Sequence, residues 1–323
     1  MIELGLGLQT NKPVGDYAAL AREAEAAGFD VVTTFNDLWF QPALPALLEI
    51  AQATERVRVG PTCLNPFSVH PVEIAGQIAA LDRASSGRAF LGLAAGAWLD
   101  SLGLDTSAPV TAIGDAWEIV RRLLAGDDVG YVGTRFSLPR GARLRYEVQR
   151  AAVPLLVGTW APRLAALAGE HADELKLGGT ANPELVAVAR ERLGTDRAGI
   201  VLGAVTVVDE DGERARAAAR TEVAMYIDVV GALDPTTELD PELLARIGER
   251  VAAHDHTAAG ALIPDEVLRR FAFAGTPADV AAQAEAIFDA GALRVDFGTP
   301  HGIDERRGIE LLCRDVLPRL RVS

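Results

Sequence analysis

The sequence predicts an α/β fold in which eight parallel strands close into a (β/α)8 TIM barrel, with insertions at its C-terminal face. Three observations lead to this fold class: short β-type runs alternate with helical patterns, the runs number eight, and they are apolar without strict alternation. The 323 residues, 49% of them hydrophobic and 24% charged, are enough to build a large core.

The first 125 residues are expected to form four strand–helix units. The first strand covers residues 2–8, and in the helical pattern after it Tyr17, Leu20 and Ala24 share a face that Gly28 ends. The other strands are expected at 29–35, 56–62 and 88–94, and their helices near 44–54, 72–84 and 113–125.

The second half of the chain supplies four more strands, expected at 153–158, 172–179, 200–208 and 293–298. Two segments, 126–152 and 231–263, exceed normal loop length, and insertions of that size often cover the active face of a barrel. A doubly wound dinucleotide-binding sheet is the weaker alternative, because the first turn, GLGLQTNKP, lacks the phosphate-binding glycine spacing. Residues 1–323 are therefore expected to form a single domain.

Charge and cysteine content exclude several classes of protein. Acidic residues outnumber basic ones by 45 to 31, and the net charge of -14 argues against nucleic-acid partners and anionic membranes. No apolar run approaches the roughly 18 residues of a membrane span, and no signal peptide is apparent, so a cytoplasmic location is expected. Cys63 and Cys313 form neither a disulfide framework nor a zinc pattern, and no metal is expected.

Polar residues that directly follow the apolar runs are the candidates for function, because the active site of such a barrel lies at the carboxyl ends of its strands. They are Gln9, Thr10, Asn36, Asp37, Asn65, Ser68, His70, Lys176 and His301. Few of these are strong acid–base groups, and hydrolase and nucleotide-binding motifs are missing. The set suits a neutral ring system that is held by hydrogen bonds and reacts by hydride transfer.

Two loops have unusual sequences. Residues 60–71, GPTCLNPFSVHP, contain prolines and an asparagine that force a shaped loop, which is either a platform for a ring or a plain link to the next helix. Residues 158–163, GTWAPR, precede a helix whose free N–H groups and Arg163 would attract a phosphate, although a bare helix cap is the alternative. Gly178 and Gly179 lead to a second helix start that could share this ligand.

Lysine and histidine are scarce, so their positions are informative. Lys176 is one of two lysines and lies inside an apolar strand, where it would contact an anionic cofactor or substrate or pair with Asp173 or Glu174. His301, directly after the eighth strand, is the histidine best placed for function, and its alternative is an exposed loop position. His254 and His256 are expected in a solvated loop.

At these residues the chain resembles the luciferase-like family of flavin and deazaflavin enzymes, nearly from end to end. The resemblance rests on Asn65-Pro66-Phe67 with His70-Pro71 and on the stretches LDRASSGRAFLGLAAG (81–96), AGEHADELKLGG (168–179) and FAGTPADVAAQAEAIFDAGA (273–292). The ending RVDFGTPHG is most similar to the methylenetetrahydromethanopterin reductase branch, whose members use coenzyme F420.

The resemblance implies a barrel that is usually dimeric, with the tricyclic ring at the carboxyl mouth. It also implies a non-prolyl cis peptide, here at Thr62-Cys63, that supports the ring from behind. The predicted cofactor-binding residues, from the residues and the resemblance together, are Thr62, Cys63, Leu64, Asn65, Gly96, Gly158, Thr159, Trp160, Ala161, Pro162, Arg163, Lys176, Gly178 and Gly179. Substrate contacts are expected from Gln9, Asn36 and Trp98, and any proton step from Asp37 or His301.

Three departures from the family pattern affect the substrate more than the cofactor. Leu38 stands where many relatives have a histidine, Val69 replaces a frequent arginine, and Ala97-Trp98 replaces an acidic residue common in the reductase branch. The sequence thus predicts a homodimeric F420-dependent oxidoreductase that moves a hydride to or from a small organic substrate. An FMN-dependent monooxygenase is the main alternative, and a non-catalytic flavin-binding barrel is the second.

Overall fold

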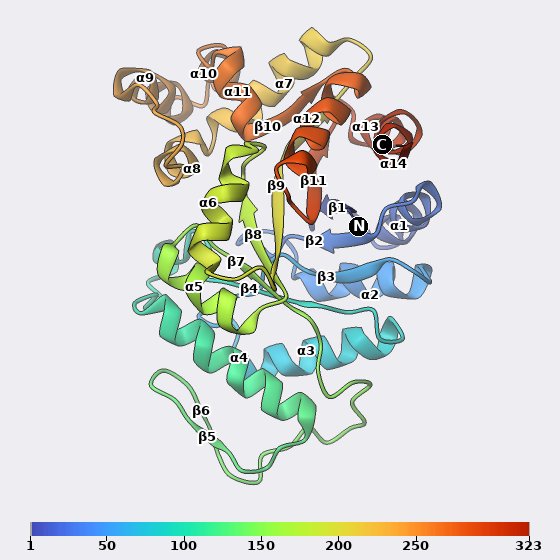
Figure 1. Ribbon diagram of the computed structural model, residues 1–323, viewed down its shortest axis with the longest axis vertical. Coiled ribbons are helices and arrows are strands. Elements are labelled where there is room, and N and C mark those ends of the chain that lie inside the picture. Colours follow the sequence, from blue (N-terminus) through green and yellow to red (C-terminus); the bar gives the residue numbers. More distant parts are fainter. Residues whose placement is uncertain (1, 323) are drawn as a thin grey trace.

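A computed structural model describes residues 2–322 and has a nearly closed barrel of eight parallel strands with helices between them, as the sequence predicts. The barrel strands are β1 (Glu3–Leu8), β2 (Val31–Thr34), β3 (Arg58–Pro61), β4 (Leu91–Ala94), β7 (Leu155–Gly158), β8 (Glu174–Gly178), β9 (Gly199–Val208) and β11 (Arg294–His301). Figure 1 shows them surrounded by helices. No helix in residues 2–322 is both long and apolar enough to cross a membrane.

Strand pairing runs in the order β3, β2, β1, β11, β9, β8, β7, β4. The circle is completed by two isolated parallel bridges, Val59 with Ala89 and Leu64 with Leu93, which join the β3 side to the β4 side. Because all eight strands run parallel, their carboxyl ends meet at one mouth.

Outer helices bury one apolar face each against the strands. They are α1 (Asp16–Ala27), α2 (Ala43–Ala53), α3 (Pro71–Ala84), α4 (Pro109–Ala125), α5 (Pro162–His171), α6 (Glu184–Leu193), α7 (Gly212–Ala224), α12 (Pro277–Asp289), α13 (Glu305–Leu311) and α14 (Leu317–Val322), with a short 3-10 helix, η1 (Leu99–Leu102), and a short π-helix, η2 (Leu312–Val316). Local signals set their ends: Gly28 closes α1 in the left-handed conformation, and Thr276 and Asp279 form a capping box on α12.

The insertion predicted at 126–152 holds a small hairpin of β5 (Tyr131–Val132) and β6 (Ser137–Leu138). It lies along the outside of α4, where the Asp115 carboxylate accepts hydrogen bonds from the Tyr131 hydroxyl and the Phe136 N–H. Figure 1 shows the hairpin at the far end of the molecule from α9 and α10. None of its residues lines the cavity at the barrel mouth, because the segment follows a helix and packs on the outer layer.

The second insertion is helical rather than a solvated loop. It contains α8 (Ile227–Leu233), α9 (Pro241–Ala252), α10 (His256–Gly260) and α11 (Asp265–Phe271), and it leads into a ninth strand, β10 (Ala272–Gly275), that the sequence analysis missed. These elements form a hydrophobic cluster of their own with α7. The ten-residue β9 serves both parts, since Gly199–Gly203 pairs with β8 while Val205–Val208 pairs with β10 on the same edge.

Candidate active site

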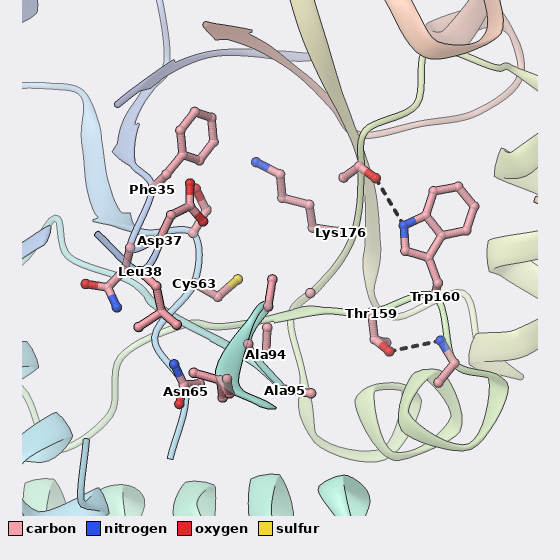
Figure 2. Close-up of a pocket in the computed structure, with 18 of the residues that line it drawn as sticks. Phe35, Asp37, Leu38, Cys63, Asn65, Ala94, Ala95, Thr159, Trp160 and Lys176 are labelled. Atoms are coloured by element: carbon pink, nitrogen blue, oxygen red, sulfur yellow. Dashed lines mark hydrogen bonds between the residues drawn. The ribbon is translucent and has the colours of Figure 1, made fainter. Parts of the chain in front are cut away.

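A cavity with two adjoining lobes opens at the carboxyl ends of the barrel strands. Figure 2 shows the first of them. The first lobe, of about 520 Å³, lies between the loops that follow β2, β3, β4 and β7. The second, of about 440 Å³, lies between the ends of β1, β8, β9 and β11 and helix α8. Phe35, Asp37, Ala97, Lys176 and Gly178 border both lobes, so the two lobes adjoin.

The back of the first lobe is built by the loop after β3. The Thr62–Cys63 peptide bond is cis, at the position that the resemblance implies. The Thr62 hydroxyl lies 3.0 Å from that of Thr33, while the Leu64 N–H and carbonyl bond to β4 through Gly92 and Ala94. These contacts hold the loop rigidly against its neighbouring strands.

Cys63 lines the first lobe as part of this wall. Burial raises the pKa of its thiol to about 12, so the side chain stays protonated at neutral pH. A neutral thiol is a poor nucleophile. Cys63 therefore acts as an apolar surface, and Gly158 gives it room, because a Cβ at that glycine would lie 2.9 Å from its sulfur.

Small residues leave the first lobe wide enough for a flat ring. Ala94, Ala95, Gly96 and Ala97 form one side, and Gly178 stands opposite, where an added Cβ would meet no atom within 4 Å. Asn65 also lines the lobe, and its Oδ1 accepts hydrogen bonds from the N–H groups of Phe67 and Ser68, at 3.1 and 2.8 Å. A mainly apolar slot fits the ring of a flavin or deazaflavin.

The predicted anion site lies at the start of α5. Thr159, Trp160 and Ala161 line the first lobe, but the Ala161 N–H already donates to the Thr159 hydroxyl at 3.0 Å. Figure 2 shows this bond beside that from the Trp160 indole to the Gly178 carbonyl. The Arg163 side chain is exposed and lines neither lobe.

The second predicted anion-binding helix start, which follows Gly178 and Gly179, has its N–H groups already bonded to the backbone. The N–H groups of Gly179 and Thr180 both donate to the carbonyl of Gly203, at 2.7 and 3.1 Å. They have no free N–H to offer a phosphate. Gly178 and Gly179 line the cavity with their backbone atoms instead.

Lys176 reaches across the barrel mouth toward Phe35 and Asp37 (Figure 2). Its ammonium lies 2.6 Å from Oδ2 of Asp296, which corrects the predicted pairing with Asp173 or Glu174. The two side chains come from strands on either side of β9, and they meet because β9 has a glycine between them: a Cβ on Gly203 would lie 3.3 Å from Lys176 Cε and 3.2 Å from Asp296 Cβ.

A buried ion network extends from this pair toward the strand starts. Asp296 also accepts from Arg294 Nε at 2.9 Å, and Arg294 Nη1 lies 2.7 Å from Glu174. Although burial favours the neutral acid, the Arg294 and Lys176 cations lower the pKa of Asp296. Arg58 and Glu3 complete the network through ion pairs with each other at 3.0 Å, with Glu174 and with Arg294. Three cations thus face three carboxylates.

Asp37 is the acid–base candidate that the structure places in the cavity. It borders both lobes, and burial raises the pKa of its carboxyl, which a hydrogen bond from Gln9 Nε2 at 3.0 Å partly offsets. A carboxyl that holds its proton to higher pH is better suited to exchange one near neutrality.

His301 does not reach the cavity. It is fully buried, with one ring nitrogen 3.3 Å from the carbonyl of Phe297 and the other 3.7 Å from Glu305, which pairs with Lys12 at 2.8 Å. Both the exposed position and direct proton transfer to a bound substrate are therefore inconsistent with its location. Because the strand β11 extends as far as His301, the imidazole is buried and does not line the cavity at the barrel mouth.

Most predicted residues nevertheless converge on the cavity. Those lining the first lobe are Asn36, Asp37, Thr62, Cys63, Asn65, Gly96, Gly158, Thr159, Trp160, Ala161, Lys176 and Gly178, and those lining the second include Gln9, Asp37, Trp98, Lys176, Gly178 and Gly179. Asn36, predicted for substrate, borders only the first lobe, and its side chain accepts from the Ala43 N–H. Leu64, Pro162, Arg163 and His301 line neither lobe.

Two groups of residues that line the cavity were not predicted from the sequence. Phe35 and Asp296 lie on or just after predicted strands, and an acidic residue within the apolar run LRVDFG was a signal for a buried partner. Tyr226, Val230 and Leu233 come from α8 and its start, and no feature of their sequence points to the cavity. The Tyr226 hydroxyl donates to the Phe271 carbonyl at 2.8 Å, so only its ring faces the lobe.

A barrel of this kind, with a two-lobed cavity and a half-buried carboxyl that borders both lobes, has the architecture of a redox-cofactor enzyme. The chain belongs to the luciferase-like monooxygenase family, whose sequence profile matches residues 1–294.

Several relatives match the whole chain. The 5,10-methylenetetrahydromethanopterin reductase of Methanopyrus kandleri is 28% identical over 99% of this chain and 100% of its own length. The F420-dependent glucose-6-phosphate dehydrogenase of Rhodococcus erythropolis is 28% identical over 94% of this chain and 92% of its own. The structure of the coenzyme F420 dependent tetrahydromethanopterin reductase from Methanopyrus kandleri superimposes with a TM-score of 0.89 at 26% identity and covers 99% of both chains.

Proposed function

We propose that this protein is a coenzyme F420-dependent oxidoreductase that transfers a hydride between the deazaflavin and a small organic substrate. The observation that carries the proposal is the likeness, over nearly the full length of both chains, to F420-dependent enzymes with two different substrates. The slot of the first lobe supports it, because its small apolar walls suit a flat, neutral ring.

Different residues of the chain would hold the ring and the tail of the cofactor. The rigid loop at Thr62 and Cys63 supports one face of the ring, and Ala94–Ala97 keep the slot apolar. Thr159, Trp160 and Ala161 border the end of the slot where α5 begins, which suits the phosphate-bearing tail. When bound, F420 supplies two-electron hydride chemistry with little reactivity toward oxygen, unlike reduced FMN.

Asp37 would handle the proton in this scheme. It borders both lobes, and the hydrogen bond from Gln9 fixes its orientation. With Leu38 next to it, the chain has no histidine at the position where many relatives carry one.

Parallel titrations with F420 and FMN test the cofactor. We expect F420 to bind more tightly at equal ionic strength, and mass spectrometry of the native protein to find F420 retained. Tighter binding of FMN, with oxygen consumption by the reduced protein, would instead identify a monooxygenase. Binding of either cofactor without turnover of any substrate would leave a non-catalytic barrel.

The place of the tail is tested with Arg163→Ala. Because Arg163 is exposed and solvent screens its charge, we expect its removal to raise the F420 dissociation constant by at most about tenfold. A phosphate-free analogue of F420 should be unaffected. Equal weakening of both ligands would mean that Arg163 is structural and that the tail lies elsewhere.

The chain is also proposed to act as one barrel domain in a homodimer, as the resemblance implies. Light scattering coupled to size-exclusion chromatography would give the mass of the assembly. A monomer at the concentration used for turnover would rule out the dimer.

A further inference from the structure

We propose that the second lobe binds an uncharged, mainly apolar substrate with one polar acceptor atom, and that Lys176, held by Asp296, donates a hydrogen bond to that atom. The inference rests on the proposed function only in assigning the first lobe to the cofactor. It adds the chemical class of the substrate and the residue that recognises it.

Lys176 has hydrogen-bonding capacity that its protein partner does not use. An ammonium carries three N–H donors, and within residues 2–322 its only hydrogen bond is the one to Asp296. The side chain is 9% exposed and borders both lobes, with its nitrogen 6.0 Å from the centre of the Phe35 ring. The remaining donors therefore face the cavity from a fixed position and need an acceptor there.

Charge balance argues that this acceptor is neutral. Asp296 already compensates the ammonium, and the network behind it pairs Arg294 and Arg58 with Glu174 and Glu3. The six groups sum to zero, and Asp37 is the remaining charged group on the wall of the second lobe. An anionic substrate would leave water for a site with no excess positive charge, at a cost that this site does not offset.

The walls of the second lobe suit an apolar body. Phe35, Ala204, Val205 and Val230 line it, with the ring of Tyr226. Trp98, 62% exposed, stands at the rim, where an aromatic side chain can cover a bound apolar molecule. A ligand with a hydrophobic body and a single carbonyl or hydroxyl oxygen matches these walls and the Lys176 donors together.

The test uses three ligands of one shape: 2-acetylnaphthalene has a neutral acceptor, 2-naphthoate is an anion, and 2-ethylnaphthalene has no acceptor. Calorimetry on F420-loaded and cofactor-free protein gives the affinities. Quenching of Trp98, compared with Trp98→Phe, checks that the ligand lies in the second lobe. We expect the acetyl compound to bind most tightly of the three.

Lys176→Met is expected to weaken binding of the acetyl compound about tenfold and to leave the ethyl compound unchanged, because it removes one charged donor. Asp296 keeps Arg294 as a partner in this variant. Lys176→Gln retains an uncharged donor, so it should keep the order of the ligands with a smaller margin; it also carries the test if Lys176→Met does not fold. Lys12→Met removes the chain's other lysine, which pairs with Glu305 outside both lobes, and should change nothing.

Three results would overturn the inference: tightest binding of the naphthoate, an unchanged affinity for the acetyl compound in both Lys176 variants, or no binding in the second lobe. Fluorescence titration of F420 on the same samples tests the proposed function separately. If F420 does not bind, the cofactor assignment fails, while the ligand order measured without cofactor still decides the role of Lys176.

Discussion

The two ends of the barrel differ in how they use charge. At the strand starts, Glu3, Arg58, Glu174 and Arg294 are locked together around the Phe90 ring, which lies 5.5 and 5.7 Å from the two guanidinium groups. At the strand ends, alanines, glycines and neutral polar side chains surround an open cavity, together with Asp37 and the mutually compensating Lys176–Asp296 pair. The contrast teaches that ionic groups serve the folded state at one end, and that the other end is kept nearly neutral for ligands.

The largest expected effect comes from breaking the ionic end. Arg294→Met removes a fully buried guanidinium and leaves Glu174 and Asp296 short of a partner, so we expect the free energy of unfolding to fall by about 3–5 kcal/mol. Urea unfolding measures it. Arg294→Lys keeps the charge and should lose less, whereas a loss below about 1 kcal/mol in the Met variant would show that the network contributes little.

A change at the neutral end should instead impair binding and spare stability. Gly178→Leu places a side chain in the open slot, and overpacking of about 1–3 kcal/mol predicts F420 binding weakened by roughly tenfold to a hundredfold. Gly178→Ala, which adds only a Cβ with no atom within 4 Å, serves as the control. Unchanged F420 affinity in the Leu variant would place the ring elsewhere.

Asp37 is a carboxyl on the wall of the cavity, and the effect of replacing it should depend on pH. Burial raises its pKa, so its contribution to stability is complete below the ordinary aspartate pKa of about 4 and is lost as the pH rises through the raised value. Asp37→Asn should therefore gain in melting temperature relative to wild type as the pH is raised, while turnover falls. Parallel melting curves of the two proteins at all pH values would contradict this.

The smallest effect is expected at an exposed ion pair. Arg121 lies 2.8 Å from Glu118 on the surface of α4, and Arg121→Ala should change the free energy of unfolding by a few tenths of a kcal/mol to about 1 kcal/mol. The change should shrink in high salt. A loss as large as that of Arg294→Met would mean that burial does not distinguish the two ends.

The barrel could be predicted from sequence because each strand carries its own local signal. Apolar runs such as 200–208 are bounded by turn residues, and their number limits the topology. The strand β10 was missed because its four residues follow directly on α11 and pair only with the far half of β9. The hairpin β5–β6 is still shorter, with two residues in each strand.

Site residues could be predicted from sequence where their place depends only on the position along one strand. Contacts that depend on the register between strands could not be predicted. Lys176 signalled a need for a partner, but Asp296 lies 120 positions away. Their meeting depends on β9 lying between them with Gly203 at the right level, which is a property of three strands together. The contribution of α8 to the cavity likewise depends on how the second insertion folds back over the mouth.

Both lysines of the chain are largely buried, Lys12 at 8% and Lys176 at 7% exposed, so the positive charge on the surface of residues 2–322 belongs to arginine. Amine-selective acylating reagents would find few targets in the folded protein. Modification at Lys176 would report directly on whether the cavity is filled, and slower labelling in the presence of a ligand would measure its occupancy. Because the chain has only two lysines, acylation of amines can serve as a probe of the barrel mouth.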